Sequence, residues 1–276
     1  MLKRLLKYEF RSIGRQLIPL YLGILGLAVV NHFFWFSNPS NRGGMNQTLG
    51  GVPAIATMMA YVAVCVALVV ITILLIIQRF YKGLLTEEGY LMFTLPCKTW
   101  QLIASKGIVA SVMTVAGTFA GILSAMLMGM SLSDWGIFFG AFGKIPWGVM
   151  FKEHALWPLY VVEGLILVLV ALFAAIGHVY ASISIGHLFN RHRVAWAIGA
   201  YIGINIAQSV IMVVFANLGN KFNWFGLDNL VSKLPASSGP WFAHVVLLGT
   251  IVLQMIPAAV FFFGTNWILT NKLNLE

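Results

Sequence analysis

The chain has 276 residues, of which 60% are hydrophobic and only 9% are charged, and its mean hydropathy is +0.89. Soluble domains carry about 25% charged residues, and this chain has too few polar residues to cover a surface in water, so the composition excludes a soluble enzyme and also a disordered chain. The net charge of +9 would suggest nucleic-acid binding in a soluble protein, but these basic residues cluster between apolar runs, as membrane topology requires.

Residues 1–16 combine apolar positions at helical spacing with basic residues between them. The apolar set is Leu2, Leu5, Leu6, Phe10 and Ile13, and the basic set is Lys3, Arg4, Lys7, Arg11 and Arg15. We expect an amphipathic helix that lies in the membrane surface and turns its basic side chains toward anionic headgroups. A basic segment that only fixes the topology is the alternative.

Six apolar runs follow along the chain. A helix rises about 1.5 Å per residue, so about 20 apolar residues cross a hydrocarbon core of about 30 Å. The runs that reach this length are residues 17–36, 54–77, 107–130, 158–185, 194–217 and 242–269. They predict an all-α integral membrane protein with six transmembrane helices in a single domain, residues 1–276.

The distribution of basic residues predicts the orientation of these spans. With the N-terminus inside, only 5 of the 17 Lys and Arg residues fall on outer loops: Arg42, Lys144, Lys152, Lys221 and Lys233. Cytoplasmic loops carry the excess of basic residues in membrane proteins. We therefore expect both termini on the cytoplasmic side.

Residues 78–106, between the second and third spans, carry the most informative pattern. Thr86 is a suitable N-cap, and Glu87 and Glu88 follow in the first turn, where the helix dipole favours acidic side chains. Pro96 stops the helix, so the sequence predicts a short helix on the inner side. Its apolar side chains would be exposed unless a partner covers them: Tyr90, Leu91, Met92, Phe93 and Leu95.

Catalytic motifs are not found in the sequence. No G-x-x-x-x-G-K-[ST] phosphate loop occurs, so we expect no ATP site, and no catalytic, cofactor or metal site, in this chain. Glu87 and Glu88 match the paired glutamates of membrane-embedded prenyl proteases only in part, because that family needs an Arg where Met92 stands. A membrane-embedded enzyme is the alternative from another functional class.

Three histidines near the inner end of the fourth span lack an accompanying carboxylate, and an interfacial position is the alternative to a metal site: His178, His187 and His192.

Four polar side chains within the predicted spans are candidates for a translocation path. Glu163 is about 9 Å into the fourth helix from its outer end, where a carboxylate should face protein or water rather than lipid. A cavity or gate residue and an interfacial glutamate that reaches the headgroups explain it equally well. Asn205, Gln208 and Gln254 could line a translocation path or form hydrogen bonds between helices.

The topology and the inner loop resemble the permease subunits of ATP-binding-cassette (ABC) transporters, in the six-span exporter class called type two. Those permeases have an amphipathic N-terminal helix and a short coupling helix after span two. The coupling helix carries a Glu, then a Gly and an apolar run that ends in Leu-Pro, and a Lys opens span three. The matching residues are Glu87, Glu88, Gly89, Tyr90, Leu91, Thr94, Leu95, Pro96 and Lys106.

This resemblance implies the membrane subunit of an exporter in a bacterial-type plasma membrane, with an amphipathic or hydrophobic substrate. ATP and Mg²⁺ would bind a separate ABC ATPase subunit, on which the coupling helix would dock. A second permease copy or a sister permease would pair with the chain among the membrane lipids, with Gly199 and Gly203 of span five as the candidate contact, and no nucleic acid is involved. A permease relative that acts as a sensor or resistance factor without transport is the alternative. The residues that would couple to the ATPase are Glu87, Glu88, Gly89, Tyr90, Leu91, Leu95 and Pro96.

Overall fold

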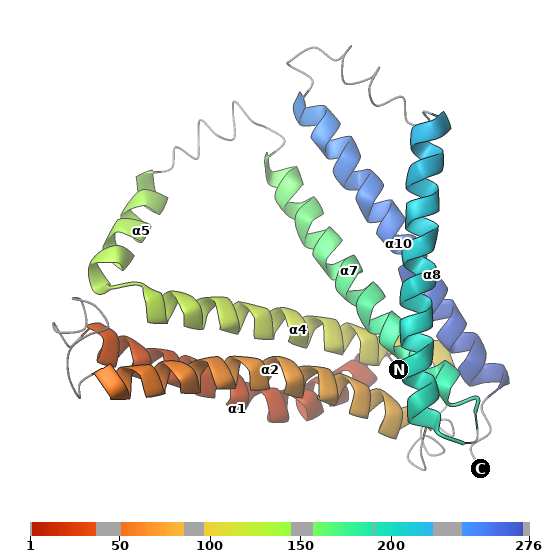
Figure 1. Cartoon of the computed structure of the whole chain (residues 1–276), viewed down its shortest axis with the longest axis horizontal. Coiled ribbons are helices and arrows are strands. Elements are labelled where there is room, and N and C mark those ends of the chain that lie inside the picture. The colour runs from red at the N-terminus through yellow and green to blue at the C-terminus, as the bar shows by residue number, and fades with distance from the viewer. Residues whose placement is uncertain are drawn as a thin grey trace. The chain divides into compact units, whose positions relative to one another are not determined.

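Figure 1 shows a computed structural model of the chain, which describes residues 2–36, 51–85, 97–144, 157–189, 191–222 and 239–272. All regular secondary structure within these residues is helical, so the predicted all-α fold is confirmed there. The helices are α1 (Leu2–Phe36), α2 (Gly51–Leu85), α4 (Thr99–Gly129), α5 (Leu132–Lys144), α7 (Trp157–Gly186), α8 (Arg193–Phe222) and α10 (Gly239–Asn271).

Six of the described helices are long and apolar enough to cross a membrane: α1, α2, α4, α7, α8 and α10. Each corresponds to one of the six predicted apolar runs, which confirms the prediction of a multi-pass membrane protein. The helices have 30 to 35 residues and are longer than the runs, because polar and basic residues at their ends continue the helical backbone.

The N-terminal segment differs from the prediction. Helix α1 continues without a break from residue 2 through the first predicted span, so residues 2–16 are the first part of that helix and not a helix of their own. The physical reason is packing: Leu6, Phe10 and Ile13 belong to the same apolar cluster as Leu17. Neighbouring helices cover the apolar side of this segment, while its basic side chains remain exposed.

The chain divides into two compact units. Unit 1 comprises Met1–Arg79 and Ile108–Pro146, and unit 2 comprises Phe80–Gly107 and Trp147–Glu276. Helices α2 and α4 therefore contribute residues to both units.

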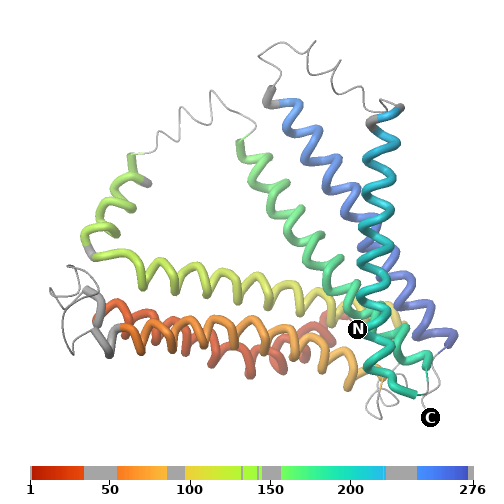
Figure 2. The backbone as a smooth tube through the Cα atoms, in the orientation of Figure 1, coloured from red at the N-terminus to blue at the C-terminus, as the bar shows by residue number. Residues whose placement is uncertain are grey.

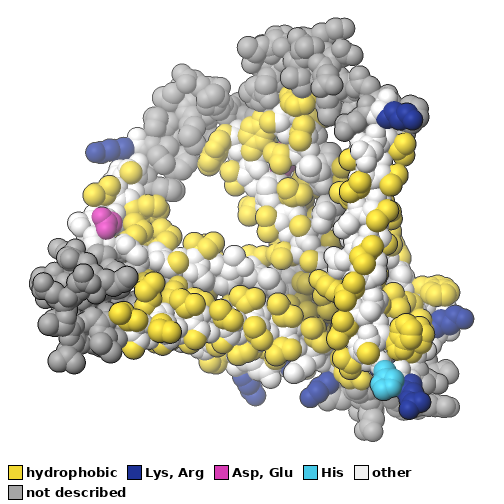
Figure 3. Space-filling view, in the orientation of Figure 1, with side chains coloured by type: hydrophobic (Ala, Val, Ile, Leu, Met, Phe, Trp, Pro, Cys, Tyr) yellow, Lys and Arg dark blue, Asp and Glu magenta, His cyan; other side chains and the backbone are white. Residues whose placement is uncertain are grey.

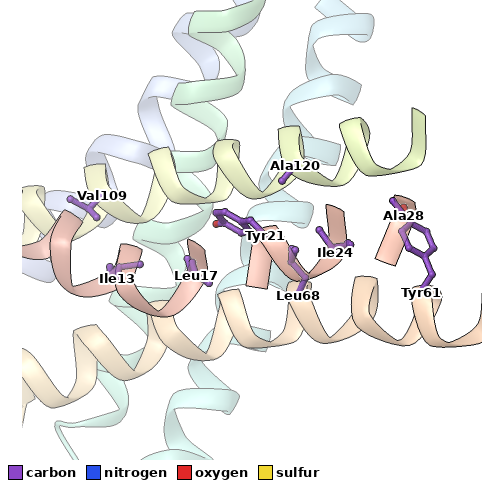
Figure 4. Close-up of a cluster of buried hydrophobic side chains, with 9 residues drawn as sticks. All are labelled: Ile13, Leu17, Tyr21, Ile24, Ala28, Tyr61, Leu68, Val109 and Ala120. Carbon is purple, nitrogen blue, oxygen red and sulfur yellow. The ribbon is translucent and has the colours of Figure 1, made fainter. Parts of the chain in front are cut away.

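Unit 1 is centred on one face of α1 (Figure 4). The α1 members of its core recur three or four positions apart and so share a face, while α2 and α4 supply the others: Ile13, Leu17, Tyr21, Ile24, Ala28, Tyr61, Leu68, Val109 and Ala120. The Tyr21 hydroxyl donates to the Met113 carbonyl at 2.8 Å, and the Tyr61 and Ser124 hydroxyls lie 2.9 Å apart. Apolar packing and two tyrosine hydrogen bonds thus join α4 to both of its neighbours.

Unit 2 is built around α7, which packs against α8 and α10 (Figure 2). Two glycines of α7 permit the close approach. A Cβ atom on Gly177 would lie 3.3 Å from the Cβ of Phe261 in α10, and one on Gly186 would lie 2.6 Å from the backbone nitrogen of Ala197 in α8. Hydrophobic side chains cover the outward surface of the long helices (Figure 3), as lipid contact requires.

Gly117 of α4 tests the packing of unit 1, because a Cβ atom there would lie 3.1 Å from the Tyr21 Oη. We predict that Gly117→Val lowers the free energy of unfolding by about 1–3 kcal/mol, since the new side chain displaces the tyrosine ring and its hydrogen bond. Gly121→Val, one turn along the same helix, is the matched control, because a Cβ atom there meets no atom within 4 Å. Thermal unfolding in one detergent compares the two variants, and equal losses would contradict this role of Gly117.

Candidate functional site

The residues predicted to couple to an ATPase lie outside the described part of the chain: Glu87, Glu88, Gly89, Tyr90, Leu91, Leu95 and Pro96. The structure describes the helix ends on both sides of them, residues 80–85 of α2 and residues 99–107 of α4, which both belong to unit 2. We call these two helix ends the root segments. Most of their residues are buried. Helix ends that only faced water would not need such burial.

The α2 root segment is fixed to α7 by an aromatic stack. The side chains of Phe80 and Leu84, one helical turn apart, are completely buried. The Phe80 ring lies parallel to the ring of Tyr180 in α7, with 4.0 Å between the ring centroids and 12° between the planes. A buried aromatic pair contributes both a large apolar area and a specific geometry, so this contact sets the position of the end of α2 on α7.

The α4 root segment packs on both α7 and α10. Gly107 makes room for the Phe173 ring of α7, since a Cβ atom on this glycine would lie 2.9 Å from the ring. Three helices enclose a cavity of about 10 Å³ next to this contact, room for no more than about one water molecule, and its lining residues are Ile103, Gly107, Phe173, Ile176, Gly177, Tyr180, Phe262 and Thr265. The interior at this point is close-packed and is too small for a substrate.

Lys106 connects the two root segments. The sequence places it among the basic residues that flank a span, but its side chain is only 3% exposed. A Cβ atom on Gly83 of α2 would lie 2.7 Å from the Lys106 ammonium nitrogen, so the glycine leaves the space that the ammonium group occupies. Sequence reasoning missed this burial because a count of basic residues says nothing of the direction in which a side chain points.

His187 lies just beyond α7 and beside the α2 root segment. Its ring meets the ring of Tyr81 edge-on, with 5.8 Å between the centroids. Burial, and then the positive charge of Arg193, hold the pKa of His187 below its ordinary value, and a hydrogen bond with the backbone of Leu85 opposes them in part. The imidazole is therefore neutral at neutral pH and is tied to the last residue of α2.

The pH dependence of this contact has a definite sign. The pKa of His187 is lower in the folded chain than its ordinary value of about 6.5, so the unfolded chain binds more protons. The buried, neutral imidazole of His187 therefore contributes fully to stability above about pH 6.5. This contribution is lost as the pH falls toward the pKa of His187 in the folded chain. We predict that Arg193→Gln raises the pKa of His187, measured by NMR titration of the imidazole, whereas Arg191→Gln, two residues earlier in the chain, leaves this pKa unchanged. Equal shifts in the two variants would contradict a specific effect of Arg193.

Glu163, the predicted cavity or gate residue, is paired with a residue that the sequence reasoning missed. Its Oε1 lies 2.6 Å from Nδ1 of His244 in α10, and the glutamate side chain is 6% exposed. The imidazole is flanked edge-on by the rings of Tyr160 and Trp241. Glu163 is the seventh residue of α7 and His244 is the sixth residue of α10, and this similar depth from the helix starts was the signal for the pair.

The Glu163 pair provides a test by compensation. We predict that His244→Phe, which retains an aromatic ring, lowers the free energy of unfolding by about 3 kcal/mol, because it leaves the buried Glu163 side chain without its imidazole partner. Adding Glu163→Leu should restore most of that loss, since an apolar pair of similar size needs no desolvation of charge. Unfolding in detergent measures both variants, and additive losses in the double variant would contradict the pairing.

The other three residues of the predicted polar path lie in α8 and α10. The exposed Asn205 donates its amide to the carbonyl of Tyr201 in its own helix, at 3.0 Å. Gln208 and Gln254 are half-buried in α8 and α10. Gly199 and Gly203 lie on an open face of α8, where a Cβ atom at either position meets no atom within 4 Å. This face therefore has the space that a neighbouring helix would need.

The three grouped histidines occupy separate places. His178 is stacked between Tyr201 and Phe261, with centroid distances of 4.6 and 4.9 Å. His192 has a φ of 58°, and its carbonyl accepts the backbone N–H of Trp196 at the start of α8. Within the described residues, no group of three or more His, Cys, Asp or Glu side chains is placed to hold a metal ion.

Comparison of the chain with protein-family models, with curated proteins and with solved structures gives no match.

Proposed function

We propose that this chain is the transmembrane subunit of an ABC exporter, driven by ATP hydrolysis in a separate ATPase subunit. Six membrane-length apolar helices and a sequence without a phosphate loop are compatible with that division of labour. The proposed location is a bacterial-type plasma membrane, with both termini and residues 86–96 on the cytoplasmic side. Two features support this function: the resemblance in residues 78–106 and the packing of the root segments.

The packing of the root segments is the observation that carries the proposal. Phe80 is stacked on Tyr180 of α7, and Gly107 lies against Phe173 of the same helix. Close-packed interiors transmit displacement instead of absorbing it. A force applied to residues 86–96 would therefore reach α7, and through the residues around the small cavity it would also reach α10.

The substrate path in this proposal forms between two permease subunits. The cavity among α4, α7 and α10 is too small for a substrate, whereas no residue in the apolar stretch of α8 is fully buried. Gly199 and Gly203 on that helix leave room for a close helix contact. An amphipathic or hydrophobic substrate suits a path with walls of this composition.

The first experiment is purification of the full-length chain from its native membrane in a mild detergent, with mass spectrometry of the proteins that accompany it. We expect a stoichiometric ABC ATPase, and in the reconstituted complex we expect the transported compound to stimulate ATP hydrolysis. An ATPase partner without transport would favour the sensor or resistance alternative. A chain that catalyses a reaction alone, with no ATPase, would overturn the proposal in favour of a membrane-embedded enzyme.

The coupling role is tested by substitution in residues 86–96. We predict that Leu91→Asp reduces transport by about tenfold or more while basal ATP hydrolysis persists, because a desolvated aspartate opposes docking of an apolar surface. Glu87→Ala should act in the same direction. Leu91→Ile, which keeps an apolar side chain, is the matched control. Normal transport by the complex with both Leu91→Asp and Glu87→Ala would contradict the coupling role.

A further inference from the structure

Unit 1 carries a basic groove that has no part in the coupling mechanism. It has a volume of about 370 Å³ and opens onto the surface between α1 and α2. The six described residues that line it provide three guanidinium groups, two hydroxyls and one amide: Tyr8, Arg11, Ser12, Arg15, Gln16 and Arg79. Nearly every polar group that faces the groove can donate a hydrogen bond, and three of them carry a positive charge.

The two helices bring these charges together by their packing. Arg79 of α2 donates a hydrogen bond to the Ser12 hydroxyl of α1, which joins the two walls of the groove. Arg11 and Arg15, one helical turn apart on α1, are exposed. The three guanidinium groups therefore surround one space, although mutual repulsion disfavours such a cluster unless an anion is present.

The depth of the groove is the second, independent observation. Gln16 comes directly before the apolar run 17–36, and Arg79 is the second residue after the apolar run 54–77. Both walls thus change from apolar to basic at the same level of the α1–α2 pair, which is the level of lipid headgroups for helices that span a membrane. Tyr8 adds an aromatic ring with a polar tip, a residue type enriched at this interface.

We propose that this groove binds a phosphate group of net negative charge at the membrane surface. Guanidinium groups match phosphate oxygens in geometry and form paired hydrogen bonds with them, and Ser12, Gln16 and Tyr8 supply further donors. The phosphate belongs to the headgroup of an anionic lipid or to a free phosphate ion. Neither source depends on ATP, so the site is independent of the proposed export function.

The experiment uses the full-length protein in detergent and native mass spectrometry. Phosphatidylglycerol is the anionic probe, and phosphatidylcholine with the same acyl chains is the comparison, because its choline cation balances the phosphate. A third arm adds inorganic phosphate. The test variant Arg11→Gln/Arg15→Gln removes two charges from the groove. The matched control Arg4→Gln/Lys7→Gln removes two exposed charges from the same helix, at residues that do not line the groove.

We expect the wild-type protein to retain phosphatidylglycerol over phosphatidylcholine, and the groove variant to lose about fivefold in that preference for each arginine removed. The control variant should keep most of the preference. Displacement of phosphatidylglycerol by inorganic phosphate, or binding of phosphate alone that the groove variant abolishes, supports the site and identifies a free ion as a ligand. Equal losses in the two double variants, or no binding of either probe by the wild-type protein, would overturn the proposal.

Discussion

The stack of Phe80 on Tyr180 is the contact on which the architecture of unit 2 depends. It fixes the end of α2 against α7 at the residue where the chain leaves unit 1 for unit 2. Lys106 and Gly107 then fix the start of α4 beside it, through the space that Gly83 leaves and through the Phe173 ring. Both helix ends are thereby held in a packed interior, which is the requirement for any role in transmitting force.

Several close contacts between helices of this chain occur at glycines. Apolar burial gives little drive between helices in lipid, so small residues that permit close packing gain in importance. Gly83, Gly107 and Gly177 each lie against a side chain of a neighbouring helix in unit 2, and Gly117 does so in unit 1. Other glycines, such as Gly199, have open space around them. They lie on helix faces that lipid or another chain can contact.

Hydropathy predicts the six long helices because the length of an apolar run determines whether it can cross a membrane. It does not determine which face of a helix is covered, and the apolar residues of this chain surround each helix. The inward packing of residues 2–16, the burial of Lys106 and the pairing of Glu163 with His244, 81 positions away, all depend on long-range contacts. The sequence predicts residues 87–96 of the candidate coupling site. The root segments on both sides of these residues can be identified only from the packing of the helices.

Helix α7 is held near both of its ends by different kinds of interaction. Glu163 pairs with His244 at one end, and Tyr180 stacks on Phe80 at the other. The 17 positions between Glu163 and Tyr180 correspond to about 26 Å of helix, close to the thickness of a hydrocarbon core. A rigid helix held in this way tilts as a whole when one end moves. Movement of the α2 root segment would therefore displace the Glu163–His244 pair through α7. This gives the pair a place in the proposed export cycle, although it lies at the other end of the helix from the root segments.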